Sequence, residues 1–349
     1  MSTEPPELDL ARVPAFWQAL GLSGLIDVHV HFLPPRMLRR VWAYFDNVGP
    51  LTGMAWPITY RWPDEDRVRH LESMGVRRFP ALAYAHKPDM AADLNDWTLD
   101  FGATTPGCVP TATFYPEPSV LSYVDKALAA GARVFKVHIQ VGGYDPREPV
   151  LDPVWGRLAE ARIPAIVHCG SGPAPGAFTG PERFAEVLRR HPRLRAVIAH
   201  LGAPEYREFV DLAERYENVV LDTTMAFTDF FENTGQPFPP DLLPRLADLG
   251  LAGKVALGSD YPNIPYPYAH QIEALQRLDL GDDWLRAVCW ANGAALIGVP
   301  ILGGGGGRPP LDVLNRIFTK SEGRTTRWCP RPAWTIFRSS RRAPPRSPC

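Results

Sequence analysis

The sequence of 349 residues lacks several features that define particular protein classes. It has no apolar run close to the ~20 residues needed to cross a bilayer, so we expect no membrane-spanning helix. Its first ten residues, MSTEPPELDL, are acidic rather than apolar, so we expect no secretory signal. Only five cysteines are present, an odd and scattered set that does not make a disulfide framework. These absences favour a protein of the reducing cytoplasm.

Net charge is also small, at −1, so the whole molecule does not favour nucleic acid or an acidic membrane as its partner. The charge is nevertheless uneven, because residues 301–349 hold ten basic and two acidic side chains and the rest of the chain is acidic. Five glycines at 303–307 are typical of a flexible linker. We therefore expect 301–349 to be a disordered tail rich in Gly, Arg and Pro, with one short helical stretch at 311–318. Its arginines and aromatic residues leave open a different function, the binding of a polyanion.

The rest of the chain alternates short apolar runs with amphipathic stretches. The runs, rich in β-branched residues, predict eight strands at 25–31, 76–82, 108–114, 134–139, 165–169, 196–200, 219–223 and 255–260. The stretches between them predict helices at 64–74, 119–130, 152–161, 181–190, 204–216 and 241–249. This alternation indicates an α/β fold, a (β/α)₈ TIM barrel over residues 25–300, with 1–24 as an N-terminal extension. An open doubly wound sheet is less favoured, because no GxGxxG follows the first predicted strand.

Several predicted strands end in a histidine or an aspartate. The first ends in Asp-Val-His-Val-His, and side chains alternate along a strand, so His29 and His31 face the same way. Later strands end at His168, His200 and Asp260. Barrel active sites lie at the carboxyl ends of the strands, and imidazole with carboxylate suits zinc and other divalent transition metals. The sequence therefore predicts a metal centre at this end of the barrel.

Five motifs in a fixed order resemble the amidohydrolase superfamily, in particular the amidohydrolase-related branch that includes aminocarboxymuconate-semialdehyde-decarboxylase-like enzymes. They are IDVHVHFLP at 26–34, VFKVH at 134–138, IVHCG at 166–170, IAHLG at 198–202 and LGSDYP at 257–262. The segment WANGAALIGV at 290–299 is similar to the helix that closes these domains.

This resemblance implies a role for each matched residue. His29, His31 and His168 would bind the metal, and so would Asp260, which would also exchange a proton with water. His200 matches a histidine that binds a second metal in binuclear members and polarises substrate or moves protons in mononuclear ones. We expect one divalent ion, Zn²⁺ with Mn²⁺ as the alternative, and leave a second metal open.

Lys136 matches the position of a carboxylated lysine in binuclear members. His138 shares its strand parity, so both residues are candidates for a second-metal or substrate contact. The segment 36–60 is expected to form an extended loop or short helix over the barrel mouth. Arg36, Arg61 and Trp56 are candidate substrate contacts, since guanidinium pairs with carboxylate and an indole stacks on planar groups.

The reaction stays open at this point between two chemistries. The first is hydrolysis of a small amide, ester or lactone by metal-activated water. The second is decarboxylation of an aromatic-derived or unsaturated acid, which would use the same residues. A small-molecule substrate is expected in both cases, and a homodimer is left open.

Overall fold

The computed structural model describes residues 7–230 and 236–297 of the 349-residue chain. The predicted tail at 301–349, with its short helix at 311–318, lies outside the described residues. Within the described ranges, no helix has the length and apolar character needed to cross a membrane.

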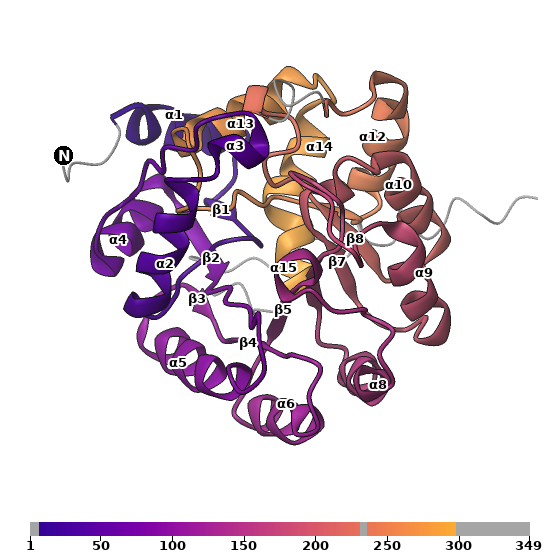
Figure 1. Cartoon of the computed structure of the whole chain (residues 1–349). Coiled ribbons are helices and arrows are strands. Elements are labelled where there is room, and N and C mark those ends of the chain that lie inside the picture. Colours follow the sequence, from indigo (N-terminus) through magenta and orange to yellow (C-terminus); the bar gives the residue numbers. More distant parts are fainter. Residues whose placement is uncertain (1–6, 231–235, 298–349) are drawn as a thin grey trace, which may run out of the picture. The chain divides into compact units, whose positions relative to one another are not determined.

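All strands of the described chain pair in parallel with their neighbours (Figure 1). They lie in sequence order, as β1 (Leu25–Ile26), β2 (Val76–Pro80), β3 (Cys108–Val109), β4 (Thr111–Thr113), β5 (Val134–His138), β6 (Ala165–His168), β7 (Ala196–Ile198), β8 (Val219–Asp222) and β9 (Val255–Ala256). Pro110 separates β3 from β4, because proline has no N–H to donate to a neighbouring strand. Counted as one, these two segments make eight strands, each within a run predicted from the sequence.

The last strand returns to the first and closes the sheet. The N–H of Val28 donates to the Leu257 carbonyl (2.8 Å), and that of His31 donates to the Tyr261 carbonyl (2.7 Å). A parallel bridge joins Val30 to Tyr261. Gly258 permits this approach, since a Cβ there would lie 2.2 Å from Thr224 Oγ1 and 2.9 Å from His29 Cβ. The predicted TIM barrel is confirmed.

Helices surround the strands, as Figure 1 shows. They are α1 (Glu7–Ala19), α2 (Pro35–Phe45), α3 (Gly49–Thr52), α4 (Asp64–Met74), α5 (Ala91–Thr104), α6 (Val120–Ala129), α7 (Ile139–Gly142), η1 (Pro149–Leu151), α8 (Asp152–Ala161), α9 (Pro181–Arg190), η2 (Ala199–Gly202), α10 (Tyr206–Arg215), η3 (Pro240–Leu242), α12 (Leu243–Leu251), α13 (Tyr268–Arg277), α14 (Asp282–Arg286), η4 (Ala287–Ala291) and α15 (Asn292–Ile297). Each of the six predicted helices is confirmed, and α4, α8 and α9 have the predicted bounds. The segment predicted as a loop or short helix after the first strand contains α2 and α3.

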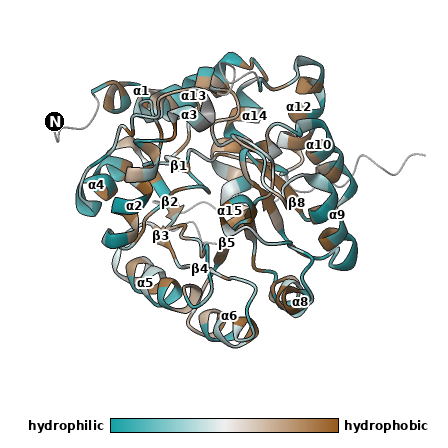
Figure 2. Cartoon of the chain, in the orientation of Figure 1, coloured by the Kyte–Doolittle hydropathy of each residue, from teal (hydrophilic) through white to brown (hydrophobic). Residues whose placement is uncertain are grey.

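The buried apolar residues form two layers. The larger fills the space between strands and helices, and the smaller, with Val134 and Ile166 among its members, fills the barrel interior. Figure 2 shows hydrophobic strands and hydrophilic residues on the outer sides of helices such as α4 and α9. Two residues beyond Val134 and Ile166, on the same face of β5 and β6, stand Lys136 and His168. The interior therefore changes from apolar to polar toward the carboxyl ends of the strands.

Candidate metal centre and its cavity

A cavity of about 910 Å³ opens at the carboxyl ends of the strands. Among its lining residues are all five of the predicted metal-binding and catalytic side chains and two candidates on β5, namely His29, His31, His168, His200 and Asp260, with Lys136 and His138. The structure thus brings together residues that lie more than two hundred positions apart in the sequence.

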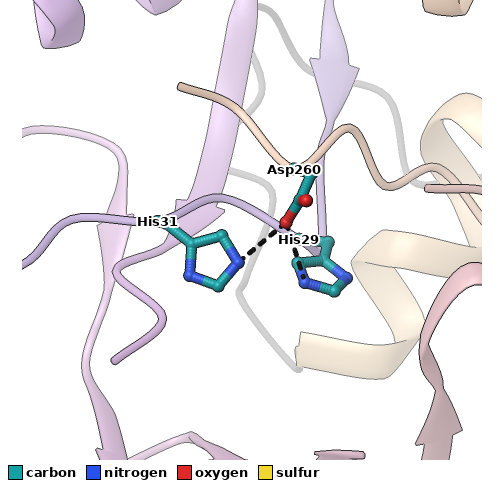
Figure 3. A group of neighbouring side chains, drawn as sticks. All are labelled: His29, His31 and Asp260. Atoms are coloured by element: carbon teal, nitrogen blue, oxygen red, sulfur yellow. Dashed lines mark ion pairs between the residues drawn. The ribbon is translucent and has the colours of Figure 1, made fainter. Parts of the chain in front are cut away.

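Three of these side chains form a compact cluster (Figure 3). The ligand atoms of His29, His31 and Asp260 all lie within 4.8 Å of one another. Asp260 Oδ1 is 2.9 Å from His31 Nε2 and 3.5 Å from His29 Nε2. Asp260 lies in the segment that follows β9 and has a positive φ of 70°. Two imidazole nitrogens and a carboxylate oxygen directed at one point make a candidate site for a divalent ion.

Hydrogen bonds on the far side of each ring fix its orientation. His29 Nδ1 donates to Asp222 Oδ2 (2.9 Å), and His31 Nδ1 donates to the Leu82 carbonyl (2.9 Å). Each ring therefore presents an Nε2 lone pair toward Asp260. Metal-bound histidines in proteins are commonly held in this way, by a carboxylate or a backbone carbonyl. A cation suits these facing electron-rich atoms, so the residues present fit a divalent metal.

Lys136 is the one ammonium group within this cluster of described residues. It is buried, and its Nζ donates to His29 Nε2 at 3.1 Å. Burial lowers the pKa of Lys136 to about 8, while the Asp222 and Asp260 charges raise it. The amine therefore lies against a candidate metal ligand, and its predicted contact with a second metal or a substrate stays a prediction.

Asp222, which the sequence interpretation did not include, supports two histidines at once. Its carboxylate accepts from His29 Nδ1 and from the backbone N–H groups of His200 (2.9 Å) and Thr224 (3.2 Å). Burial alone would raise the pKa of Asp222, but the interaction with His29 holds it below its usual range. The signal was present, because Asp222 is the last residue of β8, the position that His168 holds in β6.

Asp27 secures the backbone on the other side of the cluster. Its carboxylate accepts from Ser259 Oγ (2.5 Å), Tyr268 Oη (2.9 Å) and the His29 N–H (3.0 Å). Burial raises the pKa of Asp27 to about 7, although these hydrogen bonds lower it. Asp27 and Ser259 thereby tie the first strand to the last beside the candidate ligands.

His200 faces the cluster from the segment after β7. Its Nδ1 donates to the Thr224 carbonyl (3.1 Å), and its ring centre is 5.3 Å from that of His29. A positive φ of 56° directs it into the barrel. Burial lowers the pKa of His200, against the raising effect of Asp260 and Asp222. The imidazole is therefore neutral near pH 7, the form in which its free ring nitrogen can accept a proton.

His168 lies in the same cavity but outside the compact cluster of three. Its Nε2 donates to the Gly172 carbonyl (2.9 Å), and its ring stacks on His138 with the centres 3.9 Å apart. This stacking follows from the strand register, which pairs His138 with His168. The predicted role of His168 as a metal ligand stays a prediction. Because Nε2 is occupied by the Gly172 carbonyl, either Nδ1 would bind the metal or the ring would rotate to free Nε2.

The three predicted substrate contacts lie in different surroundings. Arg36 and Trp56 line the cavity, and the buried Trp56 indole donates to the Asn263 carbonyl (2.7 Å). Arg61 is not among the described residues that line it, and its guanidinium pairs with the exposed Asp46. Its predicted contact with a substrate stays a prediction.

Comparisons with known proteins agree with this geometry. The sequence profile of the family described as Amidohydrolase matches residues 26–299. No curated protein sequence matches the chain. Among solved structures, a TIM-barrel protein of uncharacterised function from Bordetella bronchiseptica is similar with a TM-score of 0.63 and 17% identity, covering 78% of this chain and 99% of that one.

Two similar structures carry a stated activity. A probable 2-pyrone-4,6-dicarboxylic acid hydrolase from Acinetobacter baumannii, with citric acid bound, has a TM-score of 0.54 and 13% identity over 79% of this chain and 100% of that one. A 5-carboxyvanillate decarboxylase from Novosphingobium aromaticivorans, complexed with manganese and 4-hydroxy-3-methoxy-5-nitrobenzoic acid, has a TM-score of 0.56 and 15% identity over 79% of this chain and 96% of that one. At these identities the likeness is one of fold.

Proposed function

The chain belongs to the amidohydrolase family, and from that premise we propose that it is a metal-dependent hydrolase acting on a small amide, ester or lactone. One observation carries the proposal. The Nε2 lone pairs of His29 and His31 and the Asp260 carboxylate converge at the floor of a cavity large enough for a small molecule.

We propose one divalent ion, Zn²⁺ before Mn²⁺, held by His29, His31 and Asp260 with His168 as a fourth ligand. When bound, such an ion supplies a Lewis acid and lowers the pKa of water toward neutrality. The nitrogen-rich donor set favours zinc, whereas the decarboxylase of the same fold carries manganese.

The remaining steps rest on the protein's own groups. The Asp260 carboxylate accepts a proton from the attacking water and returns it to the leaving group. Neutral His200, held by the Thr224 carbonyl, directs its second ring nitrogen to the same space and relays protons. Lys136, whose pKa burial lowers to about 8, donates a hydrogen bond to the substrate oxygen that becomes negatively charged.

A labelling experiment tests hydrolysis directly. The zinc-loaded protein is given a panel of lactones, aryl esters and amides in H₂¹⁸O, and we expect one ¹⁸O atom in the acid product. Asp260→Asn should lower kcat by at least about 100-fold, in the range of lost acid–base catalysis. Asp248→Asn, at an exposed site on α12, is the matched control and should leave kcat unchanged. No turnover of any member by the metal-loaded wild type, or full activity of Asp260→Asn, would contradict the proposal.

A second candidate function, decarboxylation of an aromatic acid, is favoured by the composition of the floor. Lys136 lines the floor beside the candidate metal ligands, so a substrate carboxylate would meet a charged hydrogen-bond donor there. Incubation with hydroxylated benzoates separates the two functions. Release of bicarbonate with no incorporation of ¹⁸O into the organic product would establish the lyase.

The number of bound metal ions distinguishes a mononuclear from a binuclear site. Elemental analysis of protein purified without added metal or chelator should give about one equivalent, because the ligand atoms of His29, His31 and Asp260 converge on one point. Two equivalents would instead support a carboxylated Lys136 that bridges two ions, with His138 near the second.

The finer predictions on partners and location keep their own tests. We propose a cytoplasmic protein with a small-molecule substrate, and a homodimer would appear in sedimentation. Binding of a polyanion through residues 301–349 would be abandoned if a chain that ends at residue 300 is retained on a heparin column as strongly as the full chain.

A further inference from the structure

Helix α2 presents an apolar face to the cavity. Its side chains recur at helical spacing, so they form one stripe along the helix and into the segment beyond it. The stripe consists of Met37, Val41, Tyr44, Phe45 and Val48, all of which line the cavity. Tyr44 remains 55% exposed, which places it at the rim rather than the floor.

Helix α5 faces the same cavity with a second stripe. Met90, Leu94 and Trp97 follow the same helical spacing and line the cavity. The Trp97 ring is kept in place by Phe101, on which it stacks with the ring centres 5.1 Å apart. The two stripes form an apolar wall that takes no part in the proposed chemistry at the floor.

Cations border this wall. Arg36 and Arg40 lie one helical turn apart on α2, and Lys87 lies just before α5; all three line the cavity and are exposed. Burial lowers the pKa of His86, and the charges of Lys87 and Arg40 lower it further. The charges of both cations therefore reach the same side chain.

The three cations are available to a ligand. Among the described residues none of them forms an ion pair within 4.0 Å, although Asp89 and Asp93 share the wall. By contrast, Arg61 and Arg67, on nearby segments, each pair with a carboxylate. Guanidinium groups without a partner beside an apolar wall suit a carboxylate at the end of an apolar chain or ring.

From these observations we propose that the substrate is an elongated anion. Its reacting carbonyl lies at the floor near Asp260, its apolar segment packs against α2 and α5, and its carboxylate binds Arg36, Arg40 and Lys87 at the mouth. This inference rests on the proposed function, and it adds a specificity site that the reacting groups do not provide. The cavity volume of about 910 Å³ accommodates such a molecule, because it is near the upper end for small-ligand sites.

Hydroxamates that carry a distant carboxylate provide the test. Succinic, adipic, suberic and sebacic monohydroxamates are titrated calorimetrically into the zinc-loaded full-length protein, beside neutral alkyl hydroxamates of equal length. At the chain length that spans floor and mouth, the carboxylate should improve Kd by about tenfold or more, as expected for charge-assisted hydrogen bonds. Acetohydroxamate reports on the metal centre alone.

Substitutions test which residues are responsible for the gain in affinity from the carboxylate. The double variant Arg40→Met/Lys87→Met should remove the tenfold advantage while leaving neutral hydroxamates and acetohydroxamate unchanged. Arg39→Met is the matched control, because Arg39 is exposed on the same helix and does not line the cavity within the described chain. Trp97→Leu should weaken the long neutral hydroxamates and leave acetohydroxamate unaffected.

The outcomes distinguish a failure of the elongated-anion proposal from a failure of the metal centre. If acetohydroxamate binds but no ω-carboxylate improves affinity, or if Arg40→Met/Lys87→Met binds the carboxylates as the wild type does, the elongated-anion proposal is overturned and the hydrolase proposal stands. If acetohydroxamate fails to bind the metal-loaded protein, the metal centre is wrong and both proposals fall.

Discussion

At the scale of single residues, the support around the candidate ligands matters as much as the ligands. Asp222 holds His29 through its ring and His200 through its backbone, so one carboxylate positions two functional side chains. We expect Asp222→Asn to weaken zinc binding about 10- to 100-fold, as is usual for a partner of a metal-bound histidine. Competition with a chelator of known affinity measures the change.

The exposed Asp241, which pairs with Arg207, provides the control for that substitution. Asp241→Asn should bind zinc as the wild type does. Unchanged zinc affinity of a folded Asp222→Asn protein would show that His29 does not depend on this carboxylate for its orientation.

Sequence alone identified His29, His31 and Asp260 because each stands in a short, recognisable strand-end motif. Asp222 escaped notice because its run, VVLD, carries no second polar residue to mark it. Its role depends on the register of β8 with its neighbours and on the turn at Thr224, which places both N–H groups on one carboxylate. Its place at a strand end was visible in the sequence, but these contacts join distant segments and could not be predicted from it.

At the scale of elements, helix α1 is attached to the barrel by one buried carboxylate. Asp9 accepts from Tyr60 Oη (2.5 Å), His70 Nε2 (2.9 Å) and the Ala269 N–H (2.7 Å), and it is fully buried. Asp9→Ala leaves these three donors without a partner. We expect a loss of about 3 kcal/mol in the free energy of unfolding, measured with urea.

Glu7 begins the same helix and is exposed, so Glu7→Ala should change that free energy by less than about 0.5 kcal/mol. Equal stability of both variants would mean that α1 is held by its apolar contacts alone. The sequence predicted 1–24 as an extension, and the polar attachment could not be foreseen, since its partners come from α4, α13 and the segment before α4.

Another electrostatic link joins the loop after α7 to helix α9. Arg147 and Arg183 both pair with Asp145, and the hydrogen bond from Arg147 leads the effects that lower the pKa of Asp145 to about 2. The unfolded chain, with an ordinary pKa near 3.8, binds more protons in this range. The contribution, about 1 kcal/mol, is therefore present above pH 4 and is lost as the pH falls through 2.

Urea titrations at pH 5 and pH 3 should show this loss in the wild type. In Asp145→Asn the difference between the two pH values should be smaller, whereas Asp248→Asn should retain the wild-type difference. A pH dependence that is identical in all three proteins would remove the link as its cause.

At the scale of the whole molecule, metal binding should depend on closure of the barrel and should therefore stabilise the folded state. His29 and His31 follow the first strand and Asp260 follows the last, so an ion held by all three binds only the folded state. We expect zinc at 100 times its Kd to add about 2.7 kcal/mol to the free energy of unfolding and to raise Tm accordingly. Calorimetry with and without chelator measures the shift.

His31→Ala should abolish this zinc-dependent shift, and His270→Ala, on the outside of α13, should preserve it. A zinc-dependent shift that survives His31→Ala would place the ion elsewhere. The order of strands and helices could be predicted at this scale because it depends on local periodicity. The apolar wall between α2 and α5 could not, since its two faces meet only in the folded barrel.

The seam between the first and last strands also has a consequence for the order of events during synthesis. The hydrogen bond from Ser259 to Asp27 joins positions that are 232 residues apart, and the candidate ligands lie in the same two segments, just after the first and the last strand. During translation His29 and His31 leave the ribosome early, and Asp260 emerges only when most of the barrel has been synthesised. Until then the growing chain offers an incoming ion an incomplete set of donors. Acquisition of the metal is therefore a late step of biogenesis, and zinc supplied after release should load the protein as fully as zinc present throughout translation.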